Sequence, residues 1–176
     1  FMPKKYVMEN NAQGRSHVSY EQDITTLPEV APKLFAMDLW VNKETPADLS
    51  GREDPTLGAN FLHEPPDGGA IFRIVDYMPG QERTVEDAKR MHAAIGSVHV
   101  PSDGEFKELK HPSMHKTDTI NYMTLAFGEL WALCEERDVL LKPGDVLIQK
   151  GCMHGWRNTS DKPARLIAVL IDSKPA

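Results

Sequence analysis

The sequence predicts an all-β protein, an antiparallel jelly-roll barrel with one inserted helix, formed by residues 1–176 as a single domain. Short apolar stretches recur at close spacing along most of the chain and are separated by turn residues, as is typical of antiparallel strands. One segment, residues 84–95, has helical signals instead. At 176 residues the chain is long enough to bury a core of its own.

The composition argues against several classes of partner. The chain is 40% hydrophobic and 26% charged, which is ordinary for a globular domain. Its net charge is −6 and it has no cluster of Lys or Arg, so we expect no nucleic-acid partner. No apolar run reaches transmembrane length and no signal peptide is found, so we expect a cytoplasmic protein without a membrane partner. The two cysteines, Cys134 and Cys152, do not make a disulfide framework.

The first half of the chain contains four strand candidates. Residues 6–8 and 15–20 flank a polar turn, and residues 34–41 form an apolar stretch after a loop punctuated by prolines. Residues 68–77 are rich in Ile, Val, Phe and Tyr and are the clearest strand of this half. Arg73 lies within it and is either a pocket residue for an anionic substrate group or a charge at the rim of the barrel. We favour the rim, because arginine is seldom buried without a partner.

Residues 79–113 interrupt the strand pattern. Thr84 and Asp87 have the spacing of a capping box, and good helix formers follow as far as Ile95, before Gly96 ends the helix. We therefore predict a helix over residues 84–95. This insertion either covers the mouth of the barrel, contacts a second subunit, or is a plain surface excursion.

Strands return at close spacing in the second half. The candidates are residues 121–127, 129–134, 139–141, 146–149 and 164–171. Gly144 and Asp145 form a turn before one of them, and a new strand begins at or just before His154. His154, Trp156 and Asn158 alternate along this strand, so all three side chains point to one face. That face carries a possible ligand, an aromatic wall and an amide, and we predict that it faces the barrel interior.

This last stretch resembles the second motif of the cupin superfamily, which is a Gly-Asp turn, a short strand, Pro-x-Gly-x-x-His and an Asn four residues later. The chain keeps Gly144, Asp145, Gly151, His154 and Asn158, but it lacks the Pro and is about one residue short between the two glycines. The first cupin motif, His-x-His, Glu and Gly, is similar to residues 115–128 in spacing. His115 and Gly128 match it, whereas Thr117 stands at the second His and Asn121 at the Glu.

The resemblance implies a divalent ion, such as Zn, Fe, Mn or Ni, held by three His and one Glu. Only His115 and His154 remain of those four ligands, so we expect weak metal binding or none. Two His and an amide oxygen would leave the ion poorly held. A third ligand could come from His111, Asp118 or Cys152, which are otherwise ordinary loop residues.

Without a metal, His115 and His154 could act as general acid and base, because imidazole titrates near neutral pH. The residues expected to bind the substrate are Thr117, Asn121, Met123, Trp156 and Asn158. Met123, Leu125 and Phe127 share a face and make the pocket apolar, which suits an aromatic or polyketide-like ligand. Tyr122 should point away from it. Four other histidines, which carry no motif, are expected at the surface: His17, His63, His92 and His99.

Three functions remain open at this stage. The first is a small-molecule enzyme resembling cupin lyases, dehydratases, decarboxylases or isomerases, working through His115 and His154. The second is a metal-dependent oxygenase with an unusual ligand set, and the third is a non-catalytic small-molecule-binding barrel. Because cupins commonly pair through N-terminal strands, and the first two strand candidates here are short, we also expect a homodimer.

Overall fold

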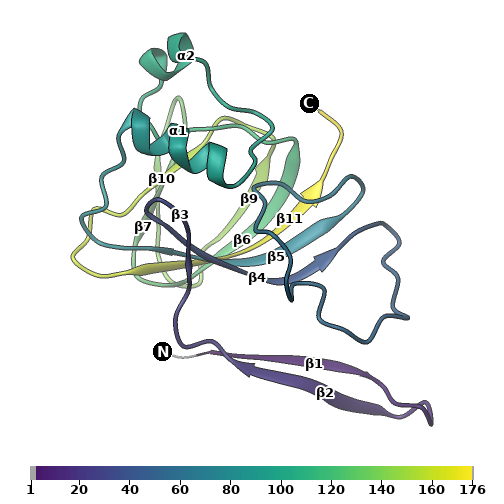
Figure 1. Ribbon diagram of the computed structural model, residues 1–176. Helices are drawn as coiled ribbons and strands as arrows, with labels where there is room; N and C mark the ends of the chain where they lie inside the picture. The colour runs from purple at the N-terminus through teal and green to yellow at the C-terminus, as the bar shows by residue number, and fades with distance from the viewer. Residues whose placement is uncertain (1–2, 176) are drawn as a thin grey trace.

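The computed structural model describes residues 3–175, which form three antiparallel sheets and two helices (Figure 1). The strand order is β1-β2 in the first sheet, β10-β7-β8 in the second, and β3-β4-β5-β11-β6-β9 in the third. The strands are β1 (Lys4–Asn10), β2 (Ser16–Asp23), β3 (Glu29–Ala31), β4 (Leu34–Asn42), β5 (Ala70–Tyr77), β6 (Thr119–Phe127), β7 (Leu130–Leu133), β8 (Val139–Leu141), β9 (Val146–Lys150), β10 (Gly155–Arg157) and β11 (Ala164–Asp172). The predicted strands are confirmed to within a few residues, and only the three-residue β3 was not expected.

Alternation along the strands separates an inner from an outer face of the six-stranded sheet. On β11, Leu166, Ala168 and Leu170 are buried, while the residues between them are partly exposed. On β6, Asn121 and Met123 are buried and Tyr122 is 46% exposed. Successive side chains of a strand point to opposite faces, so the period of two decides which residues reach the interior. The prediction that Tyr122 points away is confirmed.

The main core lies between the six-stranded and three-stranded sheets. Its buried members from the larger sheet include Met123, Leu125 and Leu166, and those from the smaller sheet include Leu130 and Trp156. Two antiparallel sheets that bury their inner faces against each other form a closed, sandwich-like barrel. The all-β jelly-roll class is confirmed.

The inserted segment forms two helices over one end of the barrel (Figure 1). α1 (Val85–Ala94) begins at Thr84, whose side chain and that of Asp87 make the predicted capping box. Met91 and Ile95 pack against Ala31, with Leu34 and Phe61 at the edge of this cluster. The helix predicted over residues 84–95 is therefore present, and its apolar side holds the insertion to the barrel.

A second, shorter helix in the insertion was not predicted. α2 (Asp103–Glu108) has its own capping box, from Ser102 and Glu105, and buries Phe106. Six residues are too few to show a helical periodicity in sequence. Of the helices within residues 3–175, none is long and apolar enough to cross a membrane.

Of the two positions considered for Arg73, the favoured one at the rim was wrong. This side chain is only 4% exposed and lies inside the molecule rather than at the rim. Its Nε and Nη2 donate to the two carboxylate oxygens of Asp38, at 2.6 and 3.2 Å, from the directly paired position on β4. The ring of Phe61 also lies 4.0 Å below the guanidinium. A bidentate carboxylate offsets the desolvation of a buried guanidinium, and this partner lies 35 residues away in sequence.

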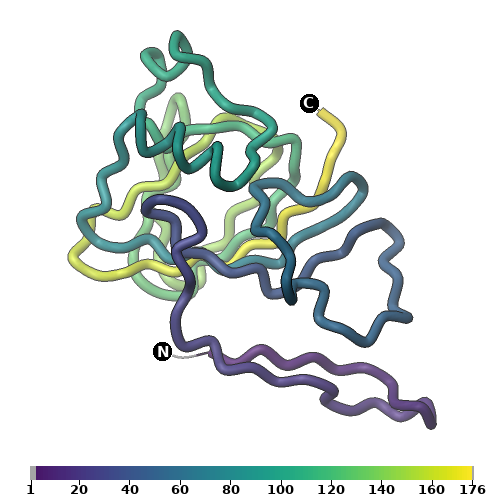
Figure 2. Tube along the Cα trace, in the orientation of Figure 1, coloured from purple at the N-terminus to yellow at the C-terminus, as the bar shows by residue number. Residues whose placement is uncertain are grey.

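The β1–β2 hairpin extends away from the barrel, as the tube of Figure 2 shows. Its strands pair with each other and with no other strand among the described residues. Tyr6, Met8 and Val18 expose more than half of their surfaces, and Met8 lies directly opposite Val18. A two-stranded hairpin with an apolar face gains stability when that face is covered.

Candidate active site

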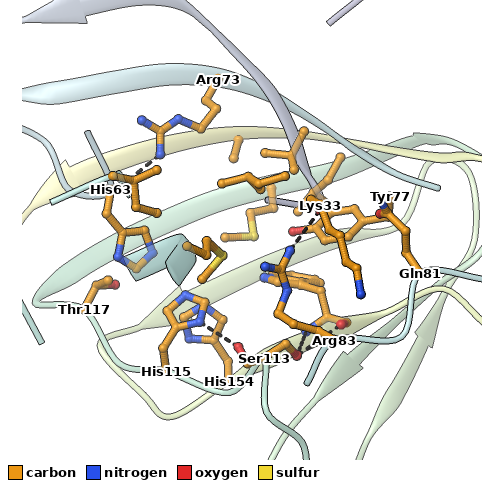
Figure 3. Close-up of a pocket in the computed structure, with 18 of the residues that line it drawn as sticks. Lys33, His63, Arg73, Tyr77, Gln81, Arg83, Ser113, His115, Thr117 and His154 are labelled. Carbon is orange, nitrogen blue, oxygen red and sulfur yellow. Dashed lines mark hydrogen bonds between the residues drawn. The ribbon is translucent and has the colours of Figure 1, made fainter. Parts of the chain in front are cut away.

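A pocket lies inside the barrel, and residues of the insertion form part of its lining (Figure 3). The sheets supply apolar and aromatic walls, which include Tyr77, Met123, Trp156, Leu166 and Leu170. The insertion supplies Arg83, Met91, Ile95, His111 and Ser113. Residues of the inserted segment therefore form part of the pocket wall, so the insertion is more than a plain surface excursion.

His115 and His154, from the two motifs, face each other in this pocket. Their main chains form an isolated antiparallel bridge, with the amide of each donating to the carbonyl of the other at 2.8 and 3.0 Å. Their ring centroids are 4.3 Å apart, and both residues are less than 9% exposed. The backbone bridge, rather than side-chain packing alone, sets the two imidazoles side by side.

The hydrogen bonds of these two rings determine their tautomer. Nδ1 of His115 lies 2.8 Å from the carbonyl of Ser113, and Nδ1 of His154 lies 2.9 Å from that of Cys152. A carbonyl oxygen only accepts, so each neutral ring carries its proton on Nδ1 and keeps a lone pair on Nε2. Burial lowers the pKa of His115, and burial followed by His115 lowers the pKa of His154 to about 3. Both rings are therefore neutral at pH 7, with Nε2 as a base or a ligand.

Two more histidines join this pair, which contradicts their predicted place at the surface. His63 and His92 are 9% and 1% exposed, and their ring centroids lie 4.8 and 5.8 Å from that of His115. The hydroxyl of Ser97 bridges them, 2.8 Å from Nδ1 of each ring. Because one hydroxyl donates only one proton, at most one of the two rings can accept at Nδ1, and the other donates to Ser97. Burial lowers the pKa of both.

A signal for one of these histidines was present in the sequence. Ala88, Met91, His92 and Ile95 follow the three- and four-residue spacing of one helix face, and Ala88, Met91 and Ile95 of that face are apolar. His92 could therefore have been assigned to the buried side of the predicted helix. His63 had no such signal, because it lies in a loop whose burial depends on the packing of distant segments.

The substituted motif positions also lie in the pocket. Thr117 Oγ1 and Thr119 Oγ1 are 2.8 Å apart, so these hydroxyls are bonded to each other. Asn121 donates from Nδ2 to Oε1 of Gln149 at 2.8 Å, which leaves its Oδ1 buried without a partner among the described residues. An unpaired buried acceptor costs stability unless a ligand or water satisfies it. Asn121 therefore has an open hydrogen-bonding position in the pocket.

Asn158 plays a different part from the one expected of it. It lies at the pocket, but its Nδ2 donates to the carbonyls of Tyr77 and Lys162, each at 2.8 Å. Its Oδ1 accepts from the amide and hydroxyl of Ser160. With these groups engaged, Asn158 ties the turn after β10 to the end of β5. Met123 and Trp156, by contrast, line the pocket as predicted.

Comparison with known proteins shows to which family the chain belongs. No protein-family model matches the chain. A cupin-domain-containing oxidoreductase of Neurospora crassa, srdB, is 35% identical over 133 residues, which cover 74% of this chain and 53% of that protein. A second cupin-domain-containing oxidoreductase, fogC of Aspergillus ruber, is 27% identical over 96% of this chain and 71% of its own length. The chain is a cupin.

Other similar proteins carry biosynthetic names. The phomopsin biosynthesis cluster protein C' of Diaporthe leptostromiformis is 26% identical over 98% of this cupin and 80% of its own length. This cupin spans about half the length of srdB, and 80% of the phomopsin protein. Among solved structures, a Cupin 2 conserved barrel domain protein from Salinispora arenicola superimposes with a TM-score of 0.43 at 15% identity, over 83% of this chain and 81% of that one.

The residues of this cupin do not fit a four-ligand metal centre. Nε2 of His115 and His154 and Oδ1 of Asn121 are free to bind, but this set has no anionic ligand. Among residues 3–175, no three or more His, Cys, Asp or Glu side chains are arranged to hold a metal ion.

None of the three alternative ligands completes the centre. Cys152 is exposed, and Asp118 lies 3.2 Å from Nε2 of His99, outside the pocket lining. His111 lines the pocket, but its Nδ1 lies 2.8 Å from Oγ of Ser113 and its Nε2 approaches Glu82 at 3.7 Å.

Proposed function

We propose that this cupin is a small-molecule enzyme that moves protons on an aromatic or polyketide-like substrate, using His115 and His154. The observation that carries the proposal is the pair of buried, neutral imidazoles, each with Nδ1 bonded to a carbonyl and Nε2 left free. The names of the similar proteins from biosynthesis clusters are consistent with small-molecule chemistry.

The chemistry follows from the free Nε2 atoms. One imidazole accepts a proton from a substrate C–H at Nε2, and the carbonyl at its Nδ1–H stabilises the imidazolium that forms. The proton then returns to another atom of the substrate. Return to carbon gives an isomerisation, and return to a leaving hydroxyl releases water. Neither outcome needs an oxidant. Asn121, through Nδ2 or Oδ1, and Trp156, through its ring, would orient the substrate.

Deuterium exchange tests this proposal before the natural substrate is known. The purified protein is incubated in D2O with a panel of aromatic and polyketide-like β-keto and β-hydroxy acids, and each compound is followed by mass spectrometry. We expect at least one compound to gain deuterium or lose water in the presence of the protein. Replacing His115 or His154 by Ala should slow the rate of deuterium gain or water loss by roughly a hundred- to ten-thousand-fold.

The matched control is Trp156→Phe, which keeps an aromatic wall and mainly raises the substrate concentration needed. Thermal unfolding of each variant must show a folded protein. If both His-to-Ala variants fold and exchange at the normal rate, His115 and His154 are not the acid–base groups.

A second function is favoured by one observation. Three of the similar proteins are named cupin-domain-containing oxidoreductases. A redox reaction requires an electron acceptor, such as O2 activated at a metal ion. Running the same incubations without O2 after chelator treatment separates the two functions, because proton transfer continues under those conditions and oxidation by O2 stops.

A further inference from the structure

The charge balance of the pocket is uneven. Among the described residues, its lining includes Lys33, Arg73 and Arg83, and includes no Asp or Glu. Two of these cations are already paired. Arg73 is bonded to Asp38 at 2.6 Å, and Lys33 is bonded to Asp87 at 2.8 Å. Arg83 makes no ion pair with any residue of 3–175, which leaves one positive charge of the pocket lining uncompensated.

The surroundings of Arg83 hold it in place and leave donors free. Nη1 donates to the carbonyl of Pro32 and Nη2 to that of Lys33, each at 2.9 Å. A guanidinium has five N–H donors, so three of them have no acceptor within residues 3–175. Asp87 is close enough to act on the charge of Arg83, but it accepts bonds from Lys33, Arg90 and the amide of Thr84.

Arg83 faces the same space as the catalytic candidates. In Figure 3, Arg83 and Tyr77 lie together on one side of the pocket, and His115 and His154 lie nearby. Burial is the main cause of the lowered pKa of His115, and the positive charge of Arg83 adds to it. The rings of Tyr77 and Trp156 form an aromatic wall with centroids 6.0 Å apart. A cation, an aromatic wall and two bases therefore share one cavity.

We propose that Arg83 is an anion-binding residue of this pocket and that the ligand is an aromatic carboxylate. The carboxylate of this ligand pairs with the free N–H donors of Arg83, and the aromatic ring of the ligand lies against Tyr77 and Trp156. Placing the reacting carbon at His115 and His154 rests on the proposed function, but binding of the anion does not. The hydrogen bonds from Arg83 to the carbonyls of Pro32 and Lys33 already hold its guanidinium in place. Little side-chain entropy is therefore lost when the anion binds.

The test compares two probes that differ only in charge. The binding of 2-naphthoate and of its neutral isostere 2-naphthamide is measured at low ionic strength by calorimetry. We expect the wild-type protein to bind the carboxylate at least about tenfold more tightly than the amide, because a charge-assisted bidentate bond is made to the carboxylate alone. Arg83→Gln should lower the affinity for 2-naphthoate to about that for 2-naphthamide. The affinity for 2-naphthamide should be nearly unchanged.

The matched control is Arg52→Gln, which removes the same charge from an exposed residue outside the pocket and should keep the preference. If Arg83→Gln fails to fold, Arg83→Lys and a salt titration of the wild-type protein take its place. Both should weaken naphthoate binding and spare naphthamide. Equal affinities of the two probes for the wild-type protein, or an unchanged preference after loss of Arg83, would overturn the proposal.

The same measurement separates this inference from the proposed function. The double variant His115→Ala, His154→Ala should still prefer naphthoate, because the anion contacts Arg83 and not the imidazoles. A preserved preference without any proton exchange by the wild-type protein supports the anion site and counts against the catalytic proposal.

Discussion

At the scale of single residues, what distinguishes this pocket is the replacement of strong metal ligands by neutral groups. Thr117 is bonded to Thr119, and Asn121 uses its amide nitrogen on Gln149, so neither position supplies an imidazole or a carboxylate. His115 and His154 keep their Nε2 atoms free. His115 and His154 thus stand at two of the four positions that the cupin resemblance gives to metal ligands, and we propose that they transfer protons instead.

Restoring the two missing ligands should restore metal binding. We expect wild-type protein loaded with Zn²⁺ to lose the metal on dialysis against a chelator. The double variant Thr117→His, Asn121→Glu should retain close to one equivalent, because a third imidazole and a carboxylate complete the set. Metal content by mass spectrometry measures both. A full equivalent held by the wild-type protein would mean that another side chain, such as His63, completes the centre.

At the scale of elements, the insertion ties its helix α1 to the barrel through buried neutral histidines. His92 of α1 is bridged by Ser97 to His63, and its ring meets that of His115 edge to face. Burial, followed by His115 and Arg83, lowers the pKa of His92 to about 4. The contact between α1 and the barrel therefore depends on these rings staying uncharged.

Acid should loosen this contact. Because the folded pKa of His92 is lowered below the unfolded value of about 6.5, the unfolded state binds more protons between these values. The stabilisation of the folded state by neutral His92 is complete above about pH 6.5 and is lost as the pH falls towards 4. We expect the free energy of unfolding of metal-free protein to fall by up to about 1.4 kcal/mol per pH unit for each such histidine.

Chemical denaturation at a series of pH values between 6.5 and 4.5 measures this slope. His92→Leu removes one titrating group, so its slope should be smaller than that of the wild type. Hydrogen exchange should locate the change in α1 before the central strands β5 and β11. A stability that does not vary with pH in this window would show that the rings are accessible to protons in the folded state.

At the scale of the whole molecule, the β1–β2 hairpin is the part whose surface is least explained by the barrel itself. Met8 and Val18 are 71% and 51% exposed and lie opposite each other on one face. An exposed apolar face on a hairpin that pairs with no other described strand indicates an interaction surface. The homodimer expected from the sequence stays a prediction, and this face is where we place its contact.

Charging the face should separate the subunits. We expect wild-type protein to behave as a dimer in light scattering at micromolar concentration, and Met8→Lys, Val18→Lys to behave as a monomer. The control, His17→Lys, Ser19→Lys, adds two lysines to the opposite face of β2, where no contact is expected. A wild-type monomer, or a dimer in both variants, would place the contact elsewhere or remove it.

The sequence by itself determined the barrel, the helix at residues 84–95 and the pairing of His115 with His154. The first two depend on local signals, which are strand periodicity and a capping box, and the third on two motifs that resemble those of cupins, in which both histidines face one cavity. Only the tertiary structure decided the burial of Arg73 and His63 and the free charge of Arg83. Each of these depends on a partner far away in the chain, such as Asp38 for Arg73 or Pro32 for Arg83. The burial of a polar side chain is decided by what surrounds it, and local spacing does not carry that information.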